Sequence, residues 1–382
     1  MDKPTVQDIF HRFYPAYLDQ YSPSPVQAKV AHNIMNCKTG AYGANVCVCE
    51  DCGFVQIHYN SCRNRCCPMC QAVPKEMWMD ARREDVLDAP YFHLVFTVPD
   101  ILNPVIYSNQ RLLYDALYHA ASSTISELTA DPKHLGAKVG YICILHTWGS
   151  EMNFHPHIHT ILLGGGLASN NQWKDNGENF FLPIRVISKM FRGKYLEELK
   201  RLWEEDKLVF HGTAEKFRNH YTFKELLDSC YGMDWIPHCK KTFNGAQTVI
   251  KYLGKYTHRI AVSNHRIVRM DDDTVTFLVK DYRNEGQWKE LTISGVEFVR
   301  RFLMHVPPRR FVRIRHYGLL CSRTKSQKLT LCRNLLGCKK YLSKLRDMEM
   351  PEILEHLYGI KVWCKACGGH LGKPQMRMPL RC

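Results

Sequence analysis

The sequence has no uninterrupted apolar run of the roughly eighteen residues that a membrane-spanning helix requires. Its first residues, Met1-Asp2-Lys3-Pro4, lack the apolar core of a signal peptide. A Walker motif, the glycine-rich loop that holds the phosphates of ATP, is also missing. From these absences we expect a cytoplasmic protein that has no membrane partner and does not draw on ATP.

Acidic residues are scarce relative to basic ones. The chain carries 37 Asp and Glu against 52 Lys and Arg, which gives a formal net charge of +15 at pH 7. Such an excess favours a polyanionic partner, nucleic acid first and a membrane surface second. At 382 residues the chain is long enough for a well-buried core and more than one domain.

Cysteine, by contrast, is abundant, with 17 residues in the chain. A reducing compartment favours metal ligation or free thiols over disulfides. Between residues 37 and 72 the sequence contains two Cys-x-x-Cys knuckles, and two such knuckles complete a tetrahedral zinc site. We therefore predict one structural zinc held by Cys49, Cys52, Cys67 and Cys70. Other cysteines nearby remain alternative ligands, namely Cys37, Cys62 and Cys66.

One more knuckle, formed by Cys364 and Cys367, lies near the end of the sequence. It is a candidate for a second zinc site, and His370 and Cys382 are its candidate completing ligands.

Histidines alternate with apolar residues in residues 154–163, a pattern that predicts a β-strand ended by the three glycines at 164–166. His157 and His159 then share one face, with Cα atoms about 6–7 Å apart, so that both imidazoles can reach one metal ion. His155 has the same parity, but it would lie about 13 Å from His159. A structural histidine pair is the competing interpretation.

The preceding residues 139–147 predict a second strand, joined to the first by a short turn. An antiparallel hairpin would bring His146 level with His157, which makes His146 the candidate third ligand. The carboxylate of Glu151, in the turn, is the alternative.

Residues 244–260 have the apolar spacing of a helix with Val249 on its buried stripe. Tyr252 and Tyr256 lie one turn apart on an adjacent stripe, about 6 Å along the axis, so that both phenols can visit one reactive centre. We interpret the neighbouring Lys255 and Arg259 as phosphate contacts. Gly254 would let a nucleic-acid strand approach the backbone. An ordinary tyrosine pair in a helix seam is the alternative.

Taken together, these motifs resemble the two-tyrosine HUH rolling-circle transposases of the insertion sequence ninety-one family. The resemblance extends from about residue 10 to 340 and is carried by residues 61–70, 146–149, 155–159, 252–256 and 311–318. One departure is Cys66, where the family pattern leads us to expect a histidine; the departure leaves the zinc ligands open.

The resemblance implies a metal-dependent endonuclease and strand transferase that acts in rolling-circle transposition. Tyr252 or Tyr256 would attack single-stranded DNA of the transposon ends and target, forming a 5′-phosphotyrosine, with Mg²⁺ or Mn²⁺ held by His157, His159 and a third ligand. The protein would then be found at the bacterial nucleoid when bound to DNA. Two other functions remain alternatives: a plasmid replication initiator or relaxase, and a non-catalytic zinc-ribbon regulator. The sequence leaves a monomer and a dimer equally open.

The fold expected is α+β, an antiparallel sheet flanked by helices with an N-terminal zinc ribbon. Basic residues interleaved with aromatic ones suit single-stranded DNA, because cations follow phosphates and rings stack on bases. On that basis the predicted DNA contacts also include Arg63, Arg65, Arg313 and Arg315. We predict a helical lead-in at 1–36, a zinc-binding DNA-binding domain at 37–89, the nuclease domain at 90–264, a β-meander with basic helices at 265–350, and a second zinc knuckle at 351–382.

Overall fold

The computed structural model describes residues 3–176, 182–235, 237–243, 249, 254, 261–281, 284–361, 363–369, 371 and 376–377. Within these residues, no helix combines the length and the apolar character needed to cross a membrane.

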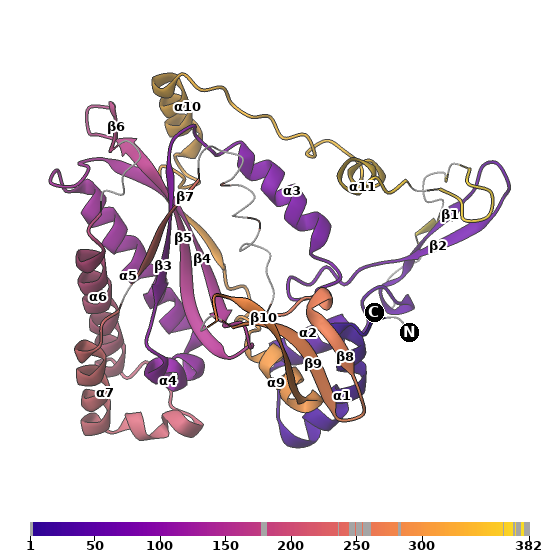
Figure 1. The fold of residues 1–382 in the computed structure, drawn as a ribbon, viewed down its shortest axis with the longest axis horizontal. Helices are drawn as coiled ribbons and strands as arrows, with labels where there is room; N and C mark the ends of the chain where they lie inside the picture. The colour runs from indigo at the N-terminus through magenta and orange to yellow at the C-terminus, as the bar shows by residue number, and fades with distance from the viewer. Residues whose placement is uncertain are drawn as a thin grey trace.

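A six-stranded antiparallel sheet forms the centre of the molecule (Figure 1). Its main path runs in the order β11-β4-β5-β3-β7, and β6 pairs with the far end of β5. The strands are β3 (Tyr91–Thr97), β4 (Lys138–Trp148), β5 (Phe154–Leu167), β6 (Trp173–Asp175), β7 (His238–Phe243) and β11 (Ile314–Gly318). With helices on both faces, the sheet confirms the predicted α+β class.

Two separate apolar clusters cover the two faces of this sheet. Alternate side chains of β3, such as Phe92 and Leu94, pack on one side against α4 (Asn103–Ser108), α5 (Gln110–Ala130), α6 (Ile184–Glu204) and α7 (His220–Gly232). On the other side, Ile144 and Ile161 pack with residues of α3 (Ala72–Arg83) and α10 (Lys325–Leu336). Because strand side chains alternate between faces, His157 and His159 lie on this second face, with Ile161.

Strand β5 does not end at its three glycines, and the predicted end of the strand is wrong. Gly165 and Gly166 continue the ladder opposite Asp175 and Lys174 of β6, respectively, and Gly166 also pairs with Val139 of β4. A Cβ on Gly165 would lie 2.4 Å from the ring of Trp173, and one on Gly166 would lie 2.5 Å from the carbonyl oxygen of Lys138. The glycines therefore permit close packing on the strand instead of terminating it.

The N-terminal helices pack against elements from the C-terminal third of the chain. Helices α1 (Val6–Gln20) and α2 (Pro25–Met35) share an apolar core with α9 (Gly295–Met304) and with the meander β8 (Ile267–Met270), β9 (Thr274–Asp281) and β10 (Gln287–Ser294). The ring of Phe10 packs edge-on against Phe302 with ring centroids 5.2 Å apart. A Cβ on Gly295 would lie 2.2 Å from the Phe13 ring, so α9 can begin there only with glycine.

An arm extends from this body and consists of β1 (Ala44–Val48) and β2 (Val55–Tyr59), with β12 (Met376–Arg377) on the other edge of β1 (Figure 1). The chain reaches the arm from α10 by way of α11 (Met350–Tyr358), passing beside α3 (Figure 1). Along this passage, Asp80 of α3 accepts hydrogen bonds from the Tyr341 and Ser343 hydroxyls, at 2.7 and 2.6 Å, and from Leu345 N at 2.9 Å.

The domain boundaries drawn from the sequence stay a prediction, but segments far apart in the chain pack together. Residues 1–36 and the meander of 265–350 share one core. Residues of 351–382 pair with the arm in 37–89. A division into consecutive segments therefore does not follow the packing.

Candidate functional site

The β4–β5 hairpin brings the three predicted histidines together. His146 pairs with His157 in the antiparallel register, and His159 follows two residues later on the same face. One ring nitrogen from each lies within 4.8 Å of those of the other two. All three side chains are buried. Among the described residues this group does not include Glu151, the alternative third ligand.

The rings of His157 and His159 are oriented by hydrogen bonds to the nitrogens that face away from the cluster. Nδ1 of His157 donates to the carbonyl oxygen of His155 at 2.7 Å, and Nδ1 of His159 lies 2.9 Å from Nε2 of His93. The Nε2 atoms of His157 and His159 are 3.1 Å apart. Histidines that ligate metals are commonly held in this way, because the outer hydrogen bond selects the tautomer and the ring orientation.

His93 is a residue of this site that the sequence did not reveal. It lies on β3, where it pairs with Ile161 and is 4% exposed. Its ring stacks on that of His159 with centroids 5.1 Å apart. The only signal in the sequence was a histidine within an otherwise apolar strand. Assigning it to the site required the β3–β5 register.

We expect His93→Leu to weaken divalent-metal binding by about 10- to 100-fold, the usual cost of losing a hydrogen bond that orients a metal-ligating histidine. His93→Gln, which keeps a polar group near Nδ1 of His159, should restore much of the affinity. Titration with Mn²⁺ followed by electron paramagnetic resonance measures the effect, and thermal unfolding checks that both variants fold. Equal affinities for wild type and His93→Leu would contradict the assigned role.

A second histidine, His305, holds the turn of the β4–β5 hairpin. Burial lowers the pKa of His305 to about 4, so the ring is neutral at pH 7. Its Nε2 donates to the carbonyl oxygen of Met152 at 3.0 Å, and its Nδ1 accepts from the Thr147 hydroxyl at 3.2 Å. Because His305 follows α9, these bonds attach the hairpin turn to the apolar core that α9 shares with α1, α2 and the meander. Trp148 beside it stacks on His146 with ring centroids 4.6 Å apart.

The predicted nucleophiles Tyr252 and Tyr256, with Lys255 and Arg259, lie outside the described residues. Two residues of the same segment, Val249 and Gly254, are described and have helical backbone. Val249 is buried in the apolar cluster that contains Ile161 of β5, on the sheet face that carries His157 and His159. The segment therefore packs on the histidine side of the sheet at Val249.

Gly254 approaches another protein element. A Cβ at this position would lie 1.9 Å from Sδ of Met79, a residue of α3. The space left by the missing side chain is filled by Met79, whereas the sequence led us to expect an approach by nucleic acid. This contact joins the segment to α3.

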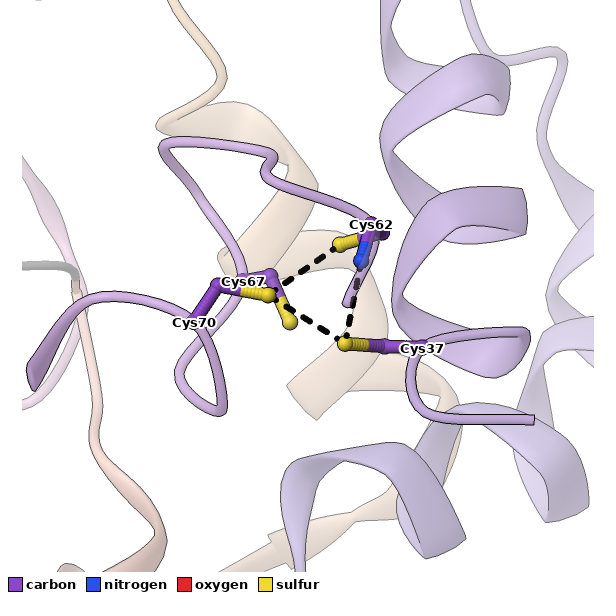
Figure 2. Close-up of side chains that lie close together, drawn as sticks. All are labelled: Cys37, Cys62, Cys67 and Cys70. Carbon is purple, nitrogen blue, oxygen red and sulfur yellow. Dashed lines mark hydrogen bonds between the residues drawn. The ribbon is translucent and has the colours of Figure 1, made fainter. Parts of the chain in front are cut away.

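The predicted zinc group of Cys49, Cys52, Cys67 and Cys70 is wrong, because the structure divides these residues between two clusters. The first cluster contains Cys37, Cys62, Cys67 and Cys70, whose sulfur atoms all lie within 4.8 Å of one another (Figure 2). Cys70 Sγ is 3.2 Å from Cys37 Sγ and 3.5 Å from Cys62 Sγ. Cys37 follows α2, so the cluster joins that helix to the loop before α3.

Cys49 and Cys52 lie instead with Cys364 and Cys367 in a second cluster. Cys49 and Cys52 lie in the connection between β1 and β2, the two strands of the arm. His370 and Cys382, the other candidate ligands of the C-terminal knuckle, lie outside the described residues. Cys66 belongs to neither cluster and lines a small pocket with Trp148, His305 and Arg313.

The predicted DNA-contacting arginines differ in whether their side chains are exposed or already contact other parts of the protein. Arg63 is exposed. Arg65 donates to the Phe311 carbonyl oxygen at 2.6 Å, and burial together with nearby Arg313 lowers the pKa of its guanidinium. Arg315 forms an ion pair with Asp115 and lies 4.0 Å from the centroid of the Tyr118 ring. Arg315 therefore serves the packing of β11 on α5, and its contact with DNA stays a prediction.

Comparisons with known proteins agree on one family. A family model described as "Putative transposase" matches residues 140–328, and one described as "Transposase zinc-binding domain" matches residues 9–98. The chain is 42% identical over 336 residues to "Putative transposase y4qJ" of Sinorhizobium fredii, covering 87% of this chain and 84% of that protein. It is 30% identical to the transposase for insertion sequence element IS801 of Pseudomonas savastanoi pv. phaseolicola, covering 80% and 72% of the two chains.

Among solved structures, the conjugative relaxase TrwC in complex with oriT DNA is matched over 43% of this chain and 71% of that chain, with 13% identity and a TM-score of 0.24.

Proposed function

The chain belongs to the insertion sequence ninety-one family of transposases, and we propose that it nicks and joins single-stranded DNA through a tyrosine-linked intermediate during rolling-circle transposition. The observation that carries the proposal is the buried group of His146, His157 and His159 on the sheet face that also receives Val249. Val249 begins the sequence stretch in which Tyr252 and Tyr256 follow at helical spacing.

The three histidines would hold one divalent cation. Their nitrogens converge, and two of the rings are oriented from behind by the His155 carbonyl and by His93. Imidazole ligands suit Mn²⁺ better than Mg²⁺, whose preference is for oxygen, although Mg²⁺ is the more abundant ion in a cell. Such a cation, when bound, would withdraw charge from a phosphodiester. The side chains present fit this role because all three rings can offer a neutral nitrogen.

Tyr252 and Tyr256 are the proposed nucleophiles. In a helix continued from Val249, positions 252 and 256 recur near the same side as 249, since three and seven residues correspond to about one and two turns. That side faces the sheet at Val249. The phenol oxygen would attack the phosphorus and form a phosphotyrosine while the P–O3′ bond breaks. The departing 3′ oxygen takes up a proton, and the reverse reaction rejoins a strand without ATP.

The phenol proton must leave during this attack, because a phenol with a pKa near 10 is mostly protonated at neutral pH. Lys255 and Arg259 are proposed to stabilise the phenolate and to hold the phosphate. Arg63, Arg65 and Arg313 would contact the DNA backbone beyond the site. Cys37, Cys62, Cys67 and Cys70 are proposed to bind a structural Zn²⁺ that holds the loop carrying Arg63 and Arg65 next to the end of α2.

The proposal is tested with single-stranded oligonucleotides that span an end of the element, labelled at either terminus. We expect a nick that requires Mn²⁺ or Mg²⁺, a free 3′-hydroxyl, and a 5′ fragment end that stays attached to the protein under denaturing conditions. A nick that leaves a free 5′-phosphate would show that water is the nucleophile. The absence of any nick on strands from both ends would favour a DNA-binding role without catalysis.

A further inference from the structure

The second cysteine cluster joins the two ends of the chain. Cys49 and Cys52 belong to the arm, whereas Cys364 and Cys367 lie more than three hundred residues later. All four sulfur atoms lie within 4.8 Å of one another. Cys49 Sγ is 3.6 Å from Cys367 Sγ, and Cys52 Sγ is 3.6 Å from Cys364 Sγ. With Zn–S bonds of about 2.3 Å, a tetrahedral site requires sulfur–sulfur distances of about 3.8 Å, close to those observed.

The two knuckles have the same backbone conformation. In the first, Gly53 N donates to Cys49 O at 3.0 Å; in the second, Gly368 N donates to Cys364 O at 2.9 Å. Both glycines adopt a left-handed φ, 68° and 73°, which other residues rarely take. One turn type therefore occurs twice and presents two thiols each time to a common centre.

Backbone N–H groups of the C-terminal knuckle point at its sulfur atoms. Ala366 N donates to Cys364 Sγ at 3.4 Å, and Gly369 N donates to Cys367 Sγ at 3.3 Å. Hydrogen bonds from backbone N–H groups stabilise a negative charge on the acceptor, so this arrangement suits thiolates, the form of cysteine that binds metals. A protonated, neutral thiol gains less from such donors than a thiolate does.

Among the described residues, few apolar contacts hold this end of the chain. The local cluster that they form contains four buried residues: Cys47, Cys49, Cys364 and Leu371. Strand β12 adds two paired positions with β1, and Cys49 forms one isolated bridge with Leu371. Small elements with so little core generally depend on a metal or a disulfide.

We propose that Cys49, Cys52, Cys364 and Cys367 bind one structural Zn²⁺ that fastens the C-terminal segment to the N-terminal arm. This ion is distinct from that of the cluster around Cys37. The ion anchors the far end of residues 337–361, which form a strap that contacts α3 at Asp80. Helix α3 in turn contacts Gly254 through Met79, and Gly254 lies between Tyr252 and Tyr256 in the sequence. The assignment does not depend on the nuclease chemistry.

Measuring the zinc content distinguishes one site shared by the two cysteine pairs from separate sites at each end of the chain. The full-length protein, purified without a metal-binding tag, should contain two zinc ions per chain by mass spectrometry. Cys49→Ser/Cys52→Ser and Cys364→Ser/Cys367→Ser should each contain one. The variant with all four substitutions should still contain one, because both pairs serve the same ion. If Cys49 and Cys52 bound a different ion from Cys364 and Cys367, the fourfold variant would contain one zinc ion fewer than either pair variant, and the proposal would fail.

A cut in the strap tests the link directly and does not rely on variants that disturb the arm. Residues 359–361 are exposed, so a protease site can be introduced there. After cleavage, the C-terminal fragment should co-elute with the rest of the protein in size-exclusion chromatography and separate when 1,10-phenanthroline removes zinc. In Cys364→Ser/Cys367→Ser it should separate on cleavage alone.

The alternatives give different results in the same experiment. A fragment that leaves without the chelator would show that no ion holds it. A fragment that survives the chelator but leaves with a reductant would identify disulfides between these cysteines. Either result overturns the proposal, whatever the outcome of the nicking assay.

Discussion

Replacing both Tyr252 and Tyr256 with phenylalanine is expected to abolish covalent attachment of the protein to DNA and to reduce nicking by at least about a thousandfold. Removal of an enzymatic nucleophile typically costs this much or more, because no other group is positioned to attack. Phenylalanine keeps the ring and its packing, so binding of single-stranded DNA should change little. The measurement is the yield of protein–oligonucleotide adduct on a denaturing gel, together with the dissociation constant for the same oligonucleotide.

The single variants and a matched control make this result interpretable. Of the single variants Tyr252→Phe and Tyr256→Phe, one should still allow the first cleavage and the other should block it. The variant that blocks it identifies the tyrosine that attacks first. Tyr221, on α7, is 76% exposed and serves as the control: Tyr221→Phe should nick like wild type. A double variant that forms the adduct at the wild-type rate would eliminate these tyrosines as nucleophiles.

The second large effect is expected from the histidines. His157→Ala and His159→Ala each remove one ligand from a group whose nitrogens converge within 4.8 Å. Because the remaining two imidazoles leave the ion under-coordinated, we expect at least about a hundredfold weaker Mn²⁺ binding, beyond the loss typical for an outer hydrogen-bond partner, and a similar loss of nicking. Calorimetric titration with Mn²⁺ and the nicking rate at saturating metal measure the two effects separately.

His155 offers a control on the same strand. It has the same parity as His157 and His159, but its ring contacts Asp100 at 3.2 Å, and it is absent from the converging group. Its carbonyl oxygen, which orients His157, is retained in His155→Ala. That variant should bind Mn²⁺ and nick DNA as wild type does. If His155→Ala were as impaired as His157→Ala, the ligands would have been assigned incorrectly.

Several features could be predicted from the sequence because short-range patterns determine them. The alternation in β5 and the short connection to β4 place His146 opposite His157, as observed. Each Cys-x-x-Cys turn is equally local, since its two thiols come from one tight turn. In all these cases the partners lie within a few residues or one hairpin.

Other features depended on contacts between distant segments. A Cys-x-x-Cys turn supplies only two of four ligands, and nothing within it specifies which pair of thiols will face it; the path of the β1–β2 arm and the return of the C-terminal segment decided that. The part played by His93 likewise required the register of β3 against β5. The glycines of β5 continue the strand because Gly165 and Gly166 pair with β4 and β6, whose Lys138 backbone and Trp173 ring fill the space beside them.

The sequence by itself therefore determined the chemical character of this protein: its basic charge, its thiol knuckles, its histidine hairpin and the tyrosine pair. Apart from the histidines of that one hairpin, it was the tertiary structure that decided which of these groups meet. The physical reason is that a turn or a strand face is set by neighbouring residues, whereas a tetrahedral thiol cluster or an oriented imidazole needs groups brought to within a few ångströms from distant parts of the chain. Only the packing of the whole molecule selects those partners.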